Sequence, residues 1–239
     1  MNNIKEQSKQ LTDIKQFYDE FKFFKTLNFE INLLINNIKE DPKKIYEIQH
    51  LSRLLARYSY AFRDFVTFTV QYVIDHNRTN LKKNLISFHF DNFYESLLAS
   101  TLGNFVKHRS QFVPISNYFD KHTYDFFINI DSIAEIYTKA SGQDKIAVHE
   151  KTELDLLDFL DVTMKCVRVQ TQCIIKQIFV DDMAGEYFKT NNKFIYDYGI
   201  PLYIEDKKIQ VFYDNITYLG EEVAKIINEF GISDIRIIK

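Results

Sequence analysis

Glycine, proline and tryptophan are the residues that this sequence has least of. Its 239 residues include six glycines, three prolines and no tryptophan. So few turn-forming residues argue against a loop-rich all-β fold. The isolated glycines form none of the glycine-rich loops that hold phosphates, and HExxH, CxxC and GxSxG motifs are absent as well. The sequence thus argues against the common nucleotide-dependent enzymes, zinc proteins and serine hydrolases, and we expect no cofactor and no metal site.

The sequence also lacks a strong net charge and a long apolar run. It has 30 Lys and Arg against 33 Asp and Glu, so any binding of nucleic acid must come from a local patch. No run of about 18 apolar residues could span a membrane, and the polar start is not that of a signal peptide. Cys166 and Cys173 lie about two helical turns apart, too far for a disulfide. We therefore expect a cytoplasmic location and no membrane partner.

What the sequence does have is a strong helical pattern. Apolar residues make up 46% of the chain, and they recur at steps of three and four over long stretches. Asp41 and Pro42 separate the first two stretches, because Asp suits the cap of a helix and Pro its first position. The pattern predicts helices over residues 4–39, 42–75, 92–114, 119–140 and 152–187, and a loop over the polar residues 142–150. Within the fourth helix, residues 128–130 could also be extended.

The pattern changes after residue 193. Residues 200–204 and 209–213 are typical of two strands of a hairpin, 219–230 of a short helix and 232–238 of a third strand. A ββαβ unit of about 45 residues is too small to be stable alone. We therefore predict a mainly α protein, with a helical bundle of five or six helices over residues 1–190. A small ββαβ unit over residues 191–239 is expected to pack on it.

One compact polar cluster follows Gly103 near the end of the third helix. Asn104 and His108 are four residues apart and share a helix face, where the amide can orient the imidazole. Lys107 and Arg109 place two positive charges beside His108, which can act as an acid or base near neutral pH. The cluster could therefore hold an anion such as a phosphate. The simpler alternative is that these are surface residues, with Gly103 easing helix packing and His108 in an interhelical hydrogen bond.

The order N-x3-H formed by Asn104 and His108 resembles the R-N-x3-H signature of the HEPN superfamily. The resemblance implies a small all-helical domain, often dimeric, of a kind found in toxin–antitoxin, abortive-infection and CRISPR systems. Many members are metal-independent ribonucleases whose Arg and His lie at a dimer interface and cleave RNA through its own 2′-hydroxyl. Gly103 stands where the family has Arg. Arg109 cannot replace it, because it lies about 100° round the helix from His108. The resemblance therefore implies a catalytically altered member.

Two functions remain open. The one that we favour is a non-enzymatic helical binding or interaction protein, whose partner is another protein or a second copy of the chain. The alternative is a HEPN-like RNA-binding or RNA-processing protein, with Asn104 and His108 as catalytic residues and Arg78, Lys107 and Arg109 contacting RNA. Five basic and two acidic residues between positions 78 and 109 give this region a net charge of +3. An exposed His108 would favour the alternative.

Overall fold

The chain divides into two compact units. The computed structural model describes residues 2–75, 93–120, 123–138, 140–178, 195–197, 200–205, 208–212, 225–226, 229–230 and 235–238. One unit combines Met1–Phe21 with Arg168–Lys239, and the other is Lys22–Val167. The long helices α1 (Asn2–Glu40) and α7 (Leu156–Lys176) supply residues to both. The described residues of the polar cluster all belong to the unit Lys22–Val167.

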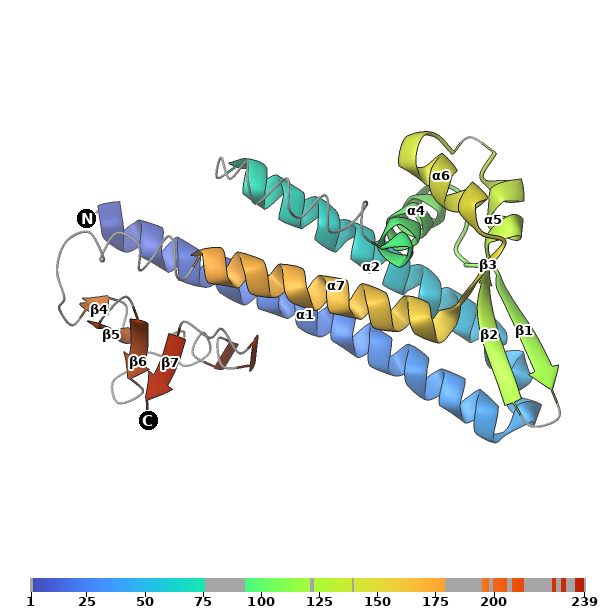
Figure 1. Cartoon of the computed structure of the whole chain (residues 1–239), viewed down its shortest axis with the longest axis horizontal. Helices are drawn as coiled ribbons and strands as arrows, with labels where there is room; N and C mark the ends of the chain where they lie inside the picture. The colour runs from blue at the N-terminus through green and yellow to red at the C-terminus, as the bar shows by residue number, and fades with distance from the viewer. Residues whose placement is uncertain are drawn as a thin grey trace. The chain divides into compact units, whose positions relative to one another are not determined.

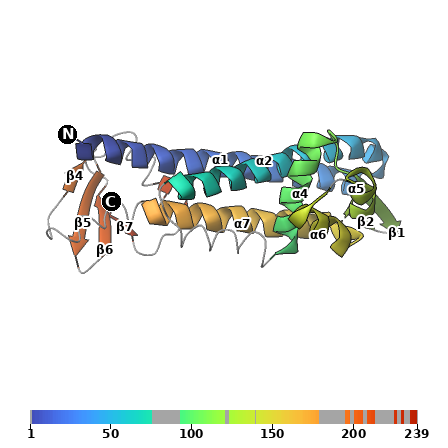
Figure 2. The ribbon, with the colours of Figure 1, turned by 90° about the horizontal axis from the view of Figure 1, so that it is seen from above.

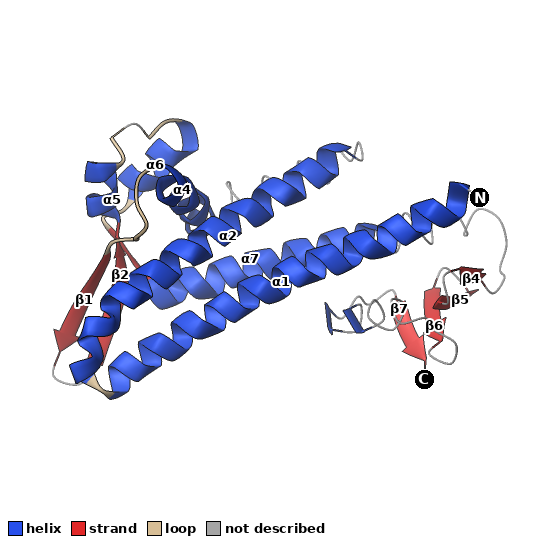
Figure 3. Ribbon diagram, turned by 180° about the vertical axis from the view of Figure 1, so that it is seen from behind, coloured by secondary structure: helices blue, strands red, loops and turns tan. Residues whose placement is uncertain are grey.

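The unit Lys22–Val167 is mainly helical and contains one small antiparallel sheet with strand order β1-β2-β3 (Figure 1; Figure 3). Besides its parts of α1 and α7, its described elements are η1 (Pro42–Glu47), α2 (Ile48–Asp75), α4 (Tyr94–His108), β1 (Ile115–Asp120), β2 (Thr123–Asn129), α5 (Ile130–Ile136), α6 (Gly142–Glu150) and β3 (Glu153–Asp155).

An aromatic core joins α1, α2 and α7 within this unit. The ring of Tyr58 on α2 lies 4.2 Å from that of Phe24 on α1 and 6.1 Å from that of Phe159 on α7. All three side chains are fully or almost fully buried. The buried hydroxyl of Tyr58 lies 2.7 Å from the hydroxyl of Thr163 on α7, so the polar end of the ring has a partner. The three helices run side by side as a bundle (Figure 2).

The predicted mainly α fold is confirmed. The described residues form six α-helices, and the first two predicted helices correspond to α1 and to η1 with α2. The predicted cap between them is also correct, because the Asp41 side chain accepts a hydrogen bond from the Lys43 backbone at 3.2 Å and Pro42 starts η1. The prediction that the cysteines do not bridge each other is confirmed, because no disulfide joins Cys166 and Cys173.

The predicted helix over residues 119–140 is wrong for most of its length. Strands β1 and β2 occupy residues up to Asn129, and only α5 is helical. The side chains of Phe126, Ile128 and Ile130 are buried, while those between them are partly exposed. This alternation has the period of a strand that buries one face. Asn129 then ends the strand and caps α5, where its side-chain oxygen accepts from the backbone of Ser132 at 2.9 Å.

Three further boundaries differ from prediction. Helix α4 ends at His108, where the helix was expected to continue to residue 114. Residues 142–150 were expected to form a loop but make up α6, a short polar helix in which only Ala147 and Val148 are buried. Helix α7 begins at Leu156, after β3, where a helix was expected from residue 152. The side chain of Asp155 accepts hydrogen bonds from the backbones of Leu157 and Asp158, so this residue caps the first turn.

Helix α4 crosses α2 at close range (Figure 2). The closest point is Gly103, where a Cβ atom would lie 2.5 Å from the Cβ of Arg63 and 2.7 Å from the carbonyl oxygen of Ser59. Real Cβ atoms do not approach other atoms so closely. The two backbones can therefore meet here only because residue 103 has no side chain.

The unit Met1–Phe21 with Arg168–Lys239 contains the second sheet, with strand order β4-β5-β6-β7. The predicted hairpin is confirmed as β5 (Ile200–Glu205) and β6 (Lys208–Phe212). The predicted third strand is β7 (Ile235–Ile238), parallel to β6, and β4 (Ile195–Asp197) was not predicted. The predicted helix between β6 and β7 is described only at residues 225–226 and 229–230, which are helical.

Phe230 anchors this second unit to its long helices. Its ring lies 4.9 Å from that of Phe21 on α1, and the guanidinium of Arg168 on α7 lies 5.8 Å from its centroid. The side chain of Gln172 donates to the Phe230 carbonyl at 3.0 Å. The short helical segment before β7 is thus packed on the ends of α1 and α7 that belong to the same unit.

Substitution of Gly103 by Ala should destabilise the protein by about 1–3 kcal/mol, because the added methyl group overpacks the contact with Arg63 and Ser59. Helix propensity alone would stabilise the Ala variant by about 1 kcal/mol. A net loss of stability in urea unfolding would therefore show that the methyl group clashes. Gly142→Asn is the control, because Gly142 has φ 56° and open space around it. Asn tolerates such a conformation, and its effect should stay below about 1 kcal/mol. A stabilised Gly103→Ala variant would contradict the packing described.

Tyr58 should make the fold sensitive to alkaline pH. Burial raises the pKa of its hydroxyl, although the hydrogen bonds with Thr163 and Asn28 lower it in part. Because the folded-state pKa lies above the unfolded value of about 10, stability is complete below that pH and falls as the pH rises past it. Tyr58→Phe should lose about 1–2 kcal/mol at neutral pH. Above pH 10 the free energy of unfolding of Tyr58→Phe should fall less steeply than that of the parent protein. The two slopes should differ by up to about 1.4 kcal/mol per pH unit.

Urea unfolding over a series of alkaline pH values measures this slope. Tyr60→Phe, on the exposed side of the same helix, is the matched control and should follow the parent protein. Identical alkaline slopes for the two variants would count against the role given to Tyr58.

Candidate functional site

The end of α4 has two sides with different surroundings. From Ser96 to Gly103 every side chain of the helix is buried, and Phe105 is buried as well. Lys107 and His108 in the last turn and Arg109 after it are exposed. Asn104 lies between these two environments and is half-buried. The predicted cluster therefore sits where a buried helix reaches the surface.

The absence of an Arg at position 103 has a steric cause. Residue 103 faces α2, and the side chain of Arg63 covers it, with the Arg63 Cδ 3.1 Å from where a Cβ would lie. A long side chain at position 103 would have to displace α2. Arg63 occupies that space and places its own guanidinium beside α4.

The Asn104 side chain links three elements. Its oxygen accepts a short hydrogen bond from the Nε of Arg63 on α2. Its Nδ2 donates to both carboxylate oxygens of Asp144 on α6, at 3.1 and 3.2 Å. Among the described residues, Asn104 makes no hydrogen bond to His108. The amide that was expected to orient His108 is thus engaged by Arg63 and Asp144.

Asp144 is the centre of this network. Besides Asn104, it accepts from the hydroxyl of Thr101 on α4 and from that of Tyr137 after α5, both at 3.0 Å. We call Arg63, Thr101, Asn104, Tyr137 and Asp144 the Asp144 network. Hydrogen bonds to an ionised carboxylate are stronger than those between neutral groups. The network therefore fixes α2, α4, α6 and the end of α5 to one another.

Two arginines surround the network. The pKa of Tyr137 is raised by burial and, next, by its hydrogen bond to Asp144. The positive charges of Arg109 and Arg63 lower it in part. Tyr137 stays a neutral donor at physiological pH.

We call Lys107, His108 and Arg109 the cationic turn. Its three side chains are exposed, and among the described residues none of them forms a hydrogen bond or an ion pair through its side chain. A helix C-terminus attracts positive charge, which explains part of this placement without any ligand. Two full charges still exceed the half charge of a helix end. Arg78, predicted to contact RNA, lies outside the described residues.

Sequence reasoning missed Arg63, Tyr137 and Asp144. Arg63 and Asp144 lie 41 and 40 residues from Asn104, so no local spacing connects them. One signal could have located α6: Ser141 and Asp144 have the S-x-x-D order of a helix start. The Ser141 side chain makes no capping hydrogen bond, however. Asp144 is instead used for the network.

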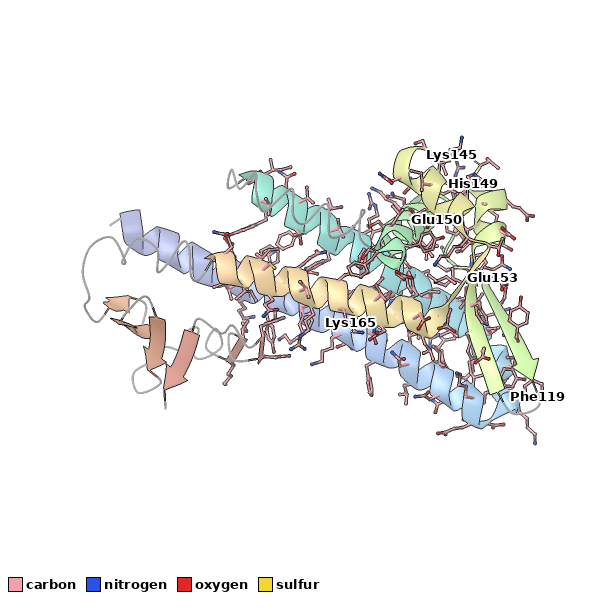
Figure 4. The ribbon with its side chains drawn as sticks, viewed as in Figure 1. Phe119, Lys145, His149, Glu150, Glu153 and Lys165 are labelled. Carbon is pink, nitrogen blue, oxygen red and sulfur yellow. The ribbon has the colours of Figure 1, made fainter. Side chains whose placement is uncertain are left out.

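A second polar region lies between α5, α6 and β3. A cavity of about 490 Å³ there is lined by Asp131, Ala134, Val148, His149, Glu150, Lys151, Thr152 and Glu153. His149 and Glu150 lie on α6 and Glu153 on β3 (Figure 4). Glu153 already accepts from the Tyr118 hydroxyl at 2.9 Å. Charges of both signs surround the cavity, so they indicate neither an anionic nor a cationic ligand. Over the described part of the chain, no three His, Cys, Asp or Glu side chains are arranged to hold a metal ion.

Comparisons with protein-family models, with curated proteins and with solved structures found no match. Within the part of the chain that is described, no helix combines the length and the apolar character needed to cross a membrane.

Loss of the Asp144 carboxylate should destabilise the protein. Asp144→Ala leaves Thr101, Asn104 and Tyr137 without their charged acceptor and should cost about 2–3 kcal/mol in urea unfolding. Glu150→Ala, at an exposed position of the same helix, is the control and should cost less than about 0.5 kcal/mol.

A readout specific to the network accompanies this test. Because Asp144 raises the pKa of Tyr137, Asp144→Ala should lower it in a tyrosine titration. The double variant Asn104→Ala with Asp144→Ala should lose less stability than the two single variants lose in sum. The difference should be at least about 0.5 kcal/mol. Additive losses and an unchanged Tyr137 titration would contradict the network.

Proposed function

We propose that the protein is a non-enzymatic helical binding protein that holds an anionic partner, RNA, at the cationic turn. The observation that supports this proposal is that the end of α4 has both a hydrogen-bonded residue and exposed basic residues. Asn104 is bound by Arg63 and Asp144, while Lys107, His108 and Arg109 remain exposed.

The engagement of Asn104 argues against catalysis. A His that transfers protons needs a neighbour that fixes the direction of its ring. In this protein the expected neighbour, Asn104, is directed toward Asp144. His108 can still form a hydrogen bond through its imidazole, but it has no orienting partner among the described residues. Such a residue can contact a phosphate without catalysing its transfer.

The local charge supports an anionic ligand. The whole chain has a formal net charge of −3, so it does not attract polyanions by its overall field. Lys107 and Arg109 nevertheless place two exposed positive charges within three residues, one on each side of His108 in the chain. Phosphate contacts by Lys and Arg supply most of the affinity in nucleic-acid binding, through the release of counterions. A second anionic surface, on a protein partner, would meet the same charges.

A HEPN-like RNA-processing activity is the second candidate. Two observations favour it: His108 is exposed, and Arg63 from α2 reaches Asn104 through the space left by Gly103. Arg63 would then supply the guanidinium that the resembling family carries at position 103. In that family the site lies at a dimer interface, so this candidate also requires self-association of the chain.

Removal of both charges should weaken RNA binding. In fluorescence anisotropy with a labelled single-stranded RNA, Lys107→Ala with Arg109→Ala should reduce the affinity about tenfold. The slope of log K against log salt should fall by about 1.4, since each lost phosphate contact removes about 0.7. The matched control removes two exposed charges elsewhere, Lys25→Ala with Lys165→Ala, and should keep the parent slope. Absence of RNA binding by the parent protein would refute the proposal.

The same RNA distinguishes the two candidates. After incubation with the parent protein and with His108→Ala, an unchanged RNA in both samples supports the binding function. Cleavage that His108→Ala abolishes, while the affinity stays within about twofold, supports the second candidate. Light scattering of the same samples shows whether the chain associates with itself.

A further inference from the structure

A cavity lies beside the cationic turn, where the start of α2 meets the segment that follows α4. It measures about 350 Å³ and is lined by Ile48, Gln49, Ser52, Phe112 and Ile115. All five belong to the unit Lys22–Val167. None of the five side chains is buried: Gln49 and Phe112 are exposed, and Ile48, Ser52 and Ile115 are half-buried. The lining therefore combines apolar walls with one amide and one hydroxyl.

Two hydrogen bonds join Val113 to Ser52, which lines this cavity. The backbone of Val113 donates to the Ser52 carbonyl at 3.4 Å, and the Ser52 hydroxyl donates to the Val113 carbonyl at 2.5 Å. The Val113 side chain is fully buried. This anchoring fixes the neighbouring Phe112 at the surface, where its side chain is 38% exposed. The ring thus forms an exposed wall of the cavity.

Positive charge lies along the same face. The guanidinium of Arg53 lies 5.1 Å from the centre of the Phe112 ring. Arg57 is four residues further along α2, is exposed, and shares the helix face of Arg53. Arg109 is three residues before Phe112, so their Cα atoms are at most about 11 Å apart. A cation of α2 therefore lies at the edge of the cavity, and the cationic turn ends three residues before its Phe112 wall.

We propose that this cavity binds an unstacked base of single-stranded RNA whose phosphates contact Arg53, Arg57 and the cationic turn. This inference rests on the proposed function and names the form of RNA that the site takes. A flat ring can stack on Phe112, as bases do on aromatic side chains in single-strand binding proteins. The Gln49 amide offers a donor and an acceptor to the base edge, and the Ser52 hydroxyl keeps a free acceptor.

The alternative occupant is an aromatic side chain of a protein partner. It would fit the apolar walls, but it would leave the charges of Arg53 and Arg57 without a role. Single-stranded RNA uses both features, because a splayed base fills the cavity while the backbone follows the cations. Double-stranded RNA keeps its bases stacked and cannot fill the cavity. The charge around the cavity thus favours nucleic acid over an aromatic side chain, and the need for an unstacked base favours the single strand.

The experiment compares three RNAs, namely a single strand, an abasic strand and a duplex, with the parent protein and three variants. The first RNA is a short labelled single strand, and the second carries the same phosphates but has abasic sites in its centre. The proteins are the parent, Phe112→Leu, which removes the ring and keeps an apolar side chain, and Phe112→Tyr, which keeps the ring. Gln111→Ala, an exposed neighbour outside the cavity, is the control. Anisotropy gives each affinity.

The parent should bind the abasic RNA about tenfold more weakly than the complete strand, which is the range expected for loss of one stacked base. Phe112→Leu should weaken binding of the complete strand about tenfold and leave binding of the abasic RNA unchanged. Phe112→Tyr and Gln111→Ala should bind like the parent. Duplex RNA of the same sequence should bind no better than the abasic strand.

The possible failures are distinct. If the parent binds RNA and loses affinity on removal of the charges of Lys107 and Arg109, but treats abasic and complete strands alike, the base site is overturned and the proposed function stands. Equal binding by Phe112→Leu and the parent overturns it in the same way. If the parent binds neither RNA, the proposed function is refuted, and the base site with it.

Discussion

The close approach of α2 and α4 at Gly103 is the contact on which the candidate site depends. With no side chain at this position, the backbone of α4 rests against Ser59 and Arg63. The Arg63 side chain extends over this contact and donates to Asn104. Asn104 in turn is directed to Asp144, which brings α6 into place. A packing constraint of one residue thus determines which polar groups meet.

This series of contacts separates hydrogen-bonded residues from exposed charged residues within one short stretch. Thr101 and Asn104 face the interior and hold neighbouring elements through Asp144. Lys107 and Arg109, less than two turns further on, face the solvent. A fully paired polar network gives a single arrangement of the elements that it connects. The exposed charges are therefore presented from a support that does not need a ligand to keep its form.

The sequence predicted the long helices well because their apolar residues recur with a helical period over many turns. The hairpin of β5 and β6 was equally clear from its alternation. Residues 115–129 were harder, since aromatic residues crowd the segment and fit a helical and a strand period alike. Helix α6 buries only two adjacent residues, so it has no periodic signal.

The candidate site could be predicted only where its residues are close in sequence. Asn104, Lys107, His108 and Arg109 form a local cluster, and the structure keeps them together at the end of α4. The partners Arg63 and Asp144 come from elements about 40 residues away on either side. Their meeting follows from how helices pack, which no spacing in one sequence reveals.

One of the two units combines Met1–Phe21 with Arg168–Lys239, two segments far apart in the sequence. This arrangement has a consequence for synthesis of the protein. Tyr18 donates to Glu229, 211 residues later in the chain. At usual ribosomal rates the aromatic residues at the start of α1 wait on the order of ten seconds or more for that partner. The unit Lys22–Val167 is continuous in sequence and can fold during this time. The start of α1 should therefore complete its packing only after residues 229–230 have been made.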